Sequence, residues 1–140
     1  MVMGGAAAGR LAQLLGREQL AGRTAPRHAG LGVWHDGALW FSSSRQSRKT
    51  RNLAADPRCV VTTENAVEPV VIEGTAEVVT DPEALARMLA LENAKYQTDY
   101  SIELLDPAVN ATIRVRPRWA FGLAEEDFTG SPTRWVFEPD

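Results

Sequence analysis

An apolar strand pattern changes into a basic helix start over residues 40–53, which read WFSSSRQSRKTRNL. Three adjacent serines offer small hydroxyl groups, and four cations follow within seven residues: Arg45, Arg48, Lys49 and Arg51. The first backbone N–H groups of a helix have no acceptor inside the helix, so they can donate to an anion. Hydroxyls, cations and open N–H groups at one junction suit a phosphate group. The stretch therefore predicts a phosphate-binding site.

Two strands are expected before this stretch and a short helix after it. Strand-like residues 31–34 and 38–41 flank the pair Asp36-Gly37, which is typical of a hairpin turn because glycine accepts a positive φ. The helix is predicted over residues 46–55, since Pro57 cannot continue a helical hydrogen-bond ladder. The basic stretch would thus stand at the end of a hairpin.

The expected helix carries its cations on one side. Three- and four-residue spacings place Arg45, Arg48, Lys49 and Asn52 on one face, whereas Leu53 can turn inward. A charge run on a short helix is most often simply solvated. The residues alone therefore leave two interpretations open, a binding face or a solvent-facing surface.

The rest of the chain alternates strands with one clear helix. Strands are expected over residues 59–63, 70–79 and 111–123, helices over 82–96 and within 6–21, an irregular segment over 100–109 and a short aromatic segment over 134–137. Asp81 can cap the clear helix, and Pro82 suits its first position. Gly74 predicts a bulge or a close backbone approach, and Pro117 predicts an edge or a bulge. The aromatic tail must pack on its own barrel or on a partner subunit.

Length and composition limit the functional classes. With 140 residues the chain is expected to form one domain over 1–140, with residues 1–22 atypical. A net charge of −3 argues against a general nucleic-acid binder. Absence of a signal peptide and of a long apolar run predicts a cytoplasmic protein that does not span a membrane.

The usual motifs of protein-based catalysis are missing. Cys59 is the single cysteine, which rules out an intramolecular disulfide and is expected to be buried. His28 and His35 have no second ligand at metal spacing, so we predict neither a metal site nor a catalytic histidine. No nucleophile elbow, Walker loop or dinucleotide fingerprint is present. If the protein is an enzyme, a bound cofactor would supply the reactive atom.

Several short motifs stand in a fixed order along the chain. They are residues 40–44, 47–49, 51–53, 56–58 and 71–76, followed by RVRPR at 114–118 and TRWVF at 133–137. Together they resemble the pyridoxamine 5′-phosphate oxidase-like split β-barrel family, and more narrowly its flavin and deazaflavin oxidoreductase branch. The likeness extends over roughly residues 28–138. It implies a mainly β protein with few helices, an α+β split β-barrel of the FMN-binding type.

The resemblance also implies a homodimer with a flavin-type cofactor in a cleft between the subunits. Ser42 and Ser43 match the small-hydroxyl positions beside the cofactor's phosphate. Arg48 and Lys49 match the paired basic positions that neutralise it, and Asn52 matches a residue typical of the branch. The other two cations of the stretch are expected to remain solvated.

The N-terminal part departs from the family pattern. Residues 1–22 do not resemble the expected first strand, and Gly32 stands where the oxidase carries a lysine. Pro69 lies near the place of a cofactor-contacting glutamine, which argues against a true pyridoxamine phosphate oxidase. We therefore expect a divergent N-terminal region and a less completely closed barrel.

The resemblance leads to one main interpretation and two alternatives. The main one is an oxidoreductase that uses coenzyme F420, or alternatively FMN, to pass hydride to a small organic acceptor. The first alternative is a non-enzymatic split barrel that binds FMN, F420 or a tetrapyrrole. The second is a folded dimer that has lost its cofactor site.

Overall fold

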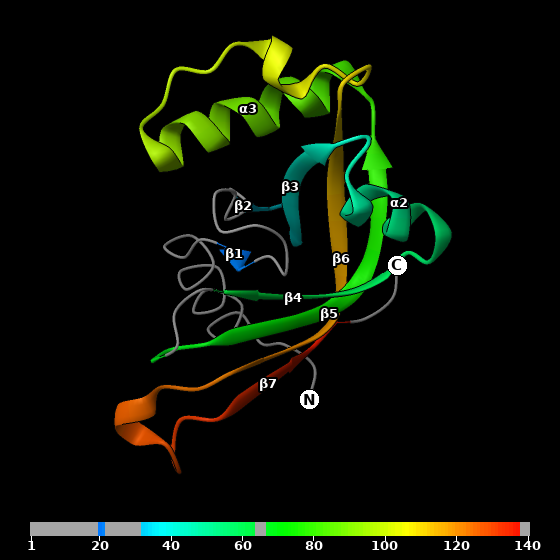
Figure 1. The fold of residues 1–140 in the computed structure, drawn as a ribbon. Coiled ribbons are helices and arrows are strands. Elements are labelled where there is room, and N and C mark those ends of the chain that lie inside the picture. The colour runs from blue at the N-terminus through cyan, green and yellow to red at the C-terminus, as the bar shows by residue number, and fades with distance from the viewer. Residues whose placement is uncertain (1–19, 22–31, 64–66, 138–140) are drawn as a thin grey trace.

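The computed structural model describes residues 20–21, 32–63 and 67–137 (Figure 1). The strands in this part are β1 (Leu20–Ala21), β2 (Gly32–His35), β3 (Ala38–Ser44), β4 (Arg58–Thr63), β5 (Val70–Val79), β6 (Asn110–Gly122) and β7 (Thr133–Val136). The helices are α2 (Arg48–Ala55), α3 (Pro82–Tyr96) and the short 3-10 helices η1 (Ile102–Leu105) and η2 (Glu125–Asp127). All strand pairs are antiparallel in the order β1-β4-β5-β6-β3-β2, and β7 pairs with β6.

The hairpin β2–β3 forms as the sequence predicts. Asp36 has a φ of 53° and Gly37 a φ of 68°, the two positive values of a type I′ turn. This turn pairs His35 with Ala38 and fixes the register of both strands. Strand β3 ends at Ser44, directly before Arg45, the first cation of the basic stretch.

A bulge divides the long β5–β6 ladder into two halves. On the edge of β6 that faces away from β5, residues 110–115 pair with β3, whereas residues 119–122 pair with β7. The register slips between Glu73 and Gly74, where Gly74 pairs with Pro117. Pro117 stands between the two partners of β6, where its missing N–H breaks no ladder bond. The predicted bulge is therefore confirmed, and it joins two half-sheets.

These half-sheets give a mainly β architecture of the split-barrel type, as expected from the sequence. One half contains β2, β3, the C-terminal part of β5 and the N-terminal part of β6. The other contains β1, β4, β7 and the remaining parts of β5 and β6. Within the described residues β1 and β2, at the ends of the strand order, do not pair with each other. The barrel is accordingly split and not closed.

Alternate residues of β3 belong to two different cores. Leu39 and Phe41 join the larger cluster between the half-sheets, where Trp135 of β7 is also buried. Ala38 and Trp40 face the opposite way and pack with Leu85 and Met88 of α3; Figure 1 shows α3 above β3. Burying one large apolar side chain stabilises a fold by roughly 1.5–3 kcal/mol. Of the two packing partners predicted for the aromatic tail, the chain's own barrel is the one observed for Trp135.

Helix α3 begins and ends at clear signals. The Asp81 carboxylate accepts a hydrogen bond of 3.0 Å from the N–H of Ala84, and Pro82 occupies the first turn, as predicted. Gln97 ends the helix with a φ of 54°. The buried residues Leu85 and Met88 of α3 pack in one cluster with Ala38 and Trp40 of β3, so this helix has a structural role.

The structure changes one expectation near the N-terminus. Leu20 and Ala21 form strand β1 and pair with Thr63 and Thr62 of β4, so the helix expected within residues 6–21 does not include them. The remainder of that segment, and residues 22–31 of the N-terminal region expected to be divergent, lie outside the described residues. No helix in the described part has the length and apolar character needed to cross a membrane.

Candidate functional site

A chain of hydroxyl hydrogen bonds connects the end of β3 to the start of α2. The Ser47 hydroxyl caps α2 by accepting the N–H of Thr50 at 3.1 Å, and it also donates to the Thr50 hydroxyl at 3.0 Å. The Thr50 hydroxyl donates to the Ser44 carbonyl at 2.8 Å. Ser43 lies 2.9 Å from Ser47, oxygen to oxygen. Four residues of the basic stretch thus hold strand and helix in one geometry.

The hydrogens in this chain can be assigned by elimination. A hydroxyl has one hydrogen to donate, and that of Ser47 is directed at Thr50. Ser43 must therefore donate to Ser47, which leaves its lone pairs available. In this arrangement Ser43 would accept from a ligand, and it could donate to a phosphate only after its hydroxyl rotates.

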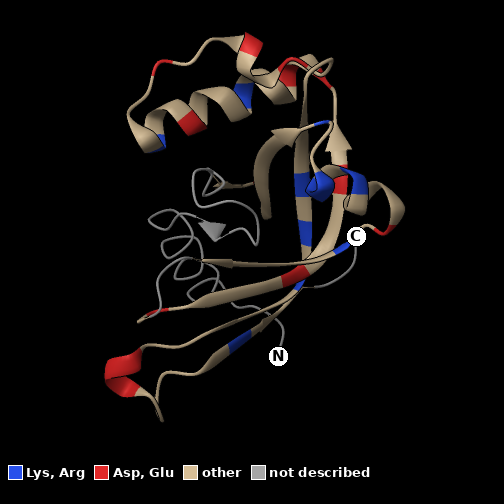
Figure 2. Ribbon diagram, viewed as in Figure 1, with Lys and Arg blue, Asp and Glu red and all other residues tan. Residues whose placement is uncertain are grey.

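The cations around this helix start have no acidic partner among the described residues. In the described part of the chain, Arg45, Arg48, Lys49 and Arg51 form no ion pair, and the first turn of α2 contains no acidic residue. The backbone N–H groups of Arg48 and Lys49 likewise have no acceptor among the described residues. Figure 2 shows Lys and Arg gathered at α2. The site therefore has uncompensated positive charge and open N–H donors, which suit an anion.

The structure brings some of the predicted residues together and separates others. Ser43 joins the helix cap, and the ammonium group of half-buried Lys49 lies 5.6 Å from the ring centroid of Phe41. Ser42 points to the opposite face of β3 and donates to the Ala111 carbonyl at a long 3.4 Å.

The other two predicted residues are exposed on α2. Arg48 lies in its first turn, and Asn52 lies one turn further along. The backbone carbonyl of Asn52 accepts the N–H of Asp56. The Asn52 side chain is exposed to solvent. The compact part of the predicted site is therefore Ser43, Lys49 and the start of α2.

The edge strand β2 supplies polar backbone groups that the sequence does not indicate. In a two-residue hairpin every second pair is hydrogen-bonded, starting at the turn, so Gly32 and Trp34 direct their backbone groups away from β3. Gly32 donates to the Tyr96 hydroxyl at 3.0 Å, and its carbonyl accepts from Tyr96 at 2.9 Å and from the Lys95 ammonium at 2.6 Å. The outward N–H and C=O of Trp34 have no partner among the described residues. Among the described residues, an unpaired donor and an unpaired acceptor therefore lie side by side on this edge.

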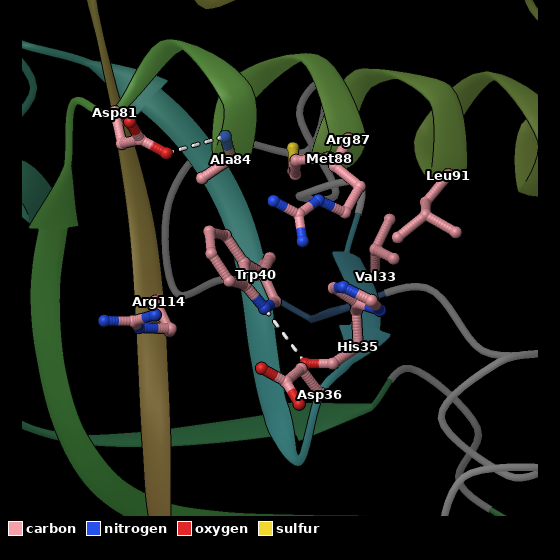
Figure 3. A pocket seen from close by; sticks show the side chains of 10 residues that line it. All are labelled: Val33, His35, Asp36, Trp40, Asp81, Ala84, Arg87, Met88, Leu91 and Arg114. Carbon is pink, nitrogen blue, oxygen red and sulfur yellow. Dashed lines mark hydrogen bonds between the residues drawn. The ribbon is translucent and has the colours of Figure 1, made fainter.

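A cavity of about 240 Å³ lies beneath α3, on the face of β3 that carries Trp40 and Ser42 (Figure 3). Its lining comes from the hairpin, α3 and β6: Val33, His35, Asp36, Trp40, Asp81, Ala84, Arg87, Met88, Leu91 and Arg114. These residues are far apart in the sequence, and the sequence of α3 is that of an ordinary helix packed against a sheet. No local pattern could have indicated the cavity.

One cation of the cavity is held by a neighbouring carboxylate. Glu77 accepts hydrogen bonds of 2.6 Å from Arg114 and 2.9 Å from Arg116. Burial raises the pKa of Glu77, but these hydrogen bonds outweigh it and lower the pKa overall. The Arg114 guanidinium also lies 5.3 Å from the ring centroid of Trp40. Arg114 is thereby held in place, and it shares the single Glu77 carboxylate with Arg116.

The family assignment follows from comparison with known proteins. The model of the family described as pyridoxamine 5′-phosphate oxidase matches residues 20–123. Because this match spans most of the chain, the protein belongs to the pyridoxamine 5′-phosphate oxidase family. A comparison with curated protein sequences returns no match.

Solved structures share the same fold at low sequence identity. The conserved hypothetical protein Rv2991 from Mycobacterium tuberculosis is 21% identical, with a TM-score of 0.64 over 89% of this chain and 87% of its own. A NimC/NimA family protein from Clostridium acetobutylicum is 14% identical, with a TM-score of 0.62 over 91% and 88%. A heme-binding protein from Mycobacterium smegmatis is 22% identical, with a TM-score of 0.50 over 74% and 43%. At these identities the likeness concerns the fold.

Proposed function

We propose that this protein binds a flavin-type cofactor and acts as an oxidoreductase, with reduced F420 as the hydride donor and FMN as the alternative cofactor. The observation that carries this proposal is the start of α2, where the described residues provide no acidic partner for the four cations and no acceptor for the first backbone N–H groups. Both cofactors carry phosphate, the group that such a site recognises. Membership of the pyridoxamine 5′-phosphate oxidase family is consistent with this choice.

The residues present fit the phosphate end of such a cofactor. Lys49 and Arg48 would neutralise the phosphate, and the N–H groups at their positions would donate to it. Ser43 would donate after its hydroxyl turns away from Ser47. When bound, the cofactor ring supplies the hydride chemistry, and the protein supplies binding and orientation.

The outward backbone of Trp34 offers a place for the ring. Flavin and deazaflavin rings share a pyrimidine edge with neighbouring N–H and C=O groups, which complements a donor and acceptor on a strand edge. The hairpin joins this edge to β3, which leads directly into the phosphate site. Phosphate and ring would therefore be held by one continuous piece of chain.

We also propose that the protein is a homodimer, as its sequence resemblance implies. The outer face of the half-sheet formed by β4, β5, β6 and β7 exposes 62% of Val60 and 36% of Phe121. Exposed apolar side chains on a sheet face often mark a protein interface. Sedimentation equilibrium should give twice the chain mass, and charged substitutions such as Val60→Glu should shift the protein towards the monomer. A monomeric wild-type protein at micromolar concentration would contradict the dimer.

Titration with both cofactors tests the main proposal. Purified protein is titrated with F420 and with FMN while cofactor fluorescence is followed, and oxidation of each reduced cofactor is then measured with a panel of small organic acceptors. We expect saturable binding of F420 and acceptor-dependent oxidation of its reduced form. Binding without turnover of any acceptor would favour the non-enzymatic alternative, and the M. smegmatis protein of similar fold is a heme-binding protein. Absence of binding by either cofactor would contradict the proposal.

A further inference from the structure

The cavity beneath α3 combines an apolar body with polar groups at its margin. Trp40, Val33, Met88 and Leu91 form its apolar part, and α3 covers it from one side (Figure 3). Its volume of about 240 Å³ exceeds the roughly 150 Å³ of an apolar cavity that takes up benzene. One six-membered ring with a small substituent therefore fits.

The polar groups of the cavity differ in whether they are already engaged. Arg114 is hydrogen-bonded to Glu77, and the Asp81 carboxylate caps α3. The Trp40 indole N–H donates to the carbonyl of His35 at 3.1 Å. The Arg87 guanidinium, by contrast, makes no hydrogen bond or ion pair within the described part of the chain. Arg87 is exposed on α3, and Figure 3 shows its side chain beside Trp40 at the margin of the cavity.

We propose that this cavity is a binding site for a small aromatic monocarboxylate. The carboxylate pairs with Arg87, whose planar guanidinium matches it with two parallel N–H donors. The ring lies against the Trp40 indole, where an aromatic pair gains more than its buried area alone provides. This site is separate from the phosphate site at α2 and does not depend on the proposed cofactor.

The remaining charges restrict the ligand to one carboxylate. Asp36 stands in the hairpin turn and Asp81 at the start of α3, both on the cavity wall. A second carboxylate on the ligand would meet these like charges, which repel it. The Arg114 guanidinium is already engaged by Glu77, which leaves fewer of its N–H donors open to a second anion. Arg87 is therefore the cation that determines the ligand's charge.

The Trp40 indole N–H gives the test a local reporter. In a ¹H–¹⁵N spectrum of the cofactor-free protein, benzoate should shift the Trp40 indole resonance in a saturable manner. The indole resonance of Trp119, on the other half-sheet, should not move and serves as an internal control. Benzamide, which has the same shape without the charge, and benzamidine, which has the opposite charge, should each bind at least about tenfold more weakly.

Two variants examine the two parts of the site separately. Arg87→Gln should weaken benzoate binding by about tenfold or more, whereas Arg118→Gln, which removes an exposed cation on β6 outside the cavity, should leave it unchanged. Ala84→Leu narrows the cavity without changing its charge and should also weaken binding. Equal binding of benzoate and benzamide, unchanged affinity in Arg87→Gln, or no saturable shift at Trp40 would overturn the proposal. Each of these results would leave the F420 and FMN titrations unaffected.

Discussion

Gly74 lies directly against the backbone of Arg116: a Cβ atom on residue 74 would stand 2.4 Å from the Arg116 carbonyl oxygen. This contact occurs at the bulge where β6 changes its second partner from β3 to β7. The absence of a side chain at residue 74 therefore allows the two half-sheets to meet. The orientation of the hairpin that carries the basic stretch depends on this junction.

Gly74→Ala should destabilise the fold. Because the obstructing atoms belong to the backbone, relief requires movement of the β5–β6 ladder, and we expect a loss of about 2 kcal/mol or more in the free energy of unfolding. Urea denaturation measures this difference. Gly130→Ala is the matched control, since a Cβ there meets only the flexible Asp127 carboxylate, at 2.7 Å, and should cost less. Equal stability of the two variants would contradict this role for Gly74.

Ser47→Ala should affect both stability and cofactor binding. It removes the cap of α2, which costs about 1 kcal/mol, and it removes the acceptor of the Ser43 hydroxyl. Chemical denaturation and cofactor titration measure the two effects. Thr98→Val is the control, because it deletes a hydroxyl hydrogen bond of 2.8 Å to Asn93 beyond the end of α3. Both variants should lose stability, but only Ser47→Ala should lose cofactor affinity.

Glu92→Gln should stabilise the protein at neutral pH. Glu92 is only 3% exposed in α3, its Oε2 has no hydrogen-bond partner among the described residues, and burial raises its pKa. A carboxyl whose folded pKa lies above its unfolded value favours the protonated state in the fold. The stability of the wild-type protein should therefore fall as the pH rises from the ordinary pKa of 4.5 through the raised value.

Thermal unfolding of wild type and Glu92→Gln from pH 4 to pH 8 tests this linkage. The variant, which cannot ionise at residue 92, should be more stable by about 1 kcal/mol or more at pH 7, and the difference should shrink towards pH 4. A variant that is less stable than wild type at pH 7 would show that the charged carboxylate has a favourable partner.

Much of the fold could be predicted from the sequence because its signals are local. Asp36-Gly37 specifies the turn, Asp81 with Pro82 specifies the start of α3, and strand periodicity gives β5 its observed bounds. The segment over 100–109, expected to be irregular, contains the single turn η1. Strand β1 carries no such signal, since two residues are too short to show a period and their pairing with β4 is a tertiary contact.

The candidate site was only partly predictable for a related reason. The run of Ser43, Ser47 and Lys49 is contiguous, so its chemistry can be read from the sequence. That Ser42 faces away from this cluster follows from the register of β3 and not from residue type. The position of Lys95 at the Gly32 carbonyl depends on how α3 crosses β2, which no sequence pattern specifies. The position of the cavity beneath α3, which Arg87 lines, depends on the same crossing of α3 over β2.

The central claim is that the start of α2 holds the phosphate of a flavin-type cofactor, and Lys49→Ala tests it most directly. Lys49 lies over the Phe41 ring and has no acidic partner in the described residues, so its removal should leave the fold intact. Calorimetric titration with F420 should show affinity weaker by about 1–3 kcal/mol, the range for one charge-assisted contact. Added salt should reduce the affinity of wild type more than that of the variant. Arg118→Ala, which removes an exposed cation on β6 and not on α2, should bind like wild type. Unchanged affinity in Lys49→Ala would contradict the phosphate site.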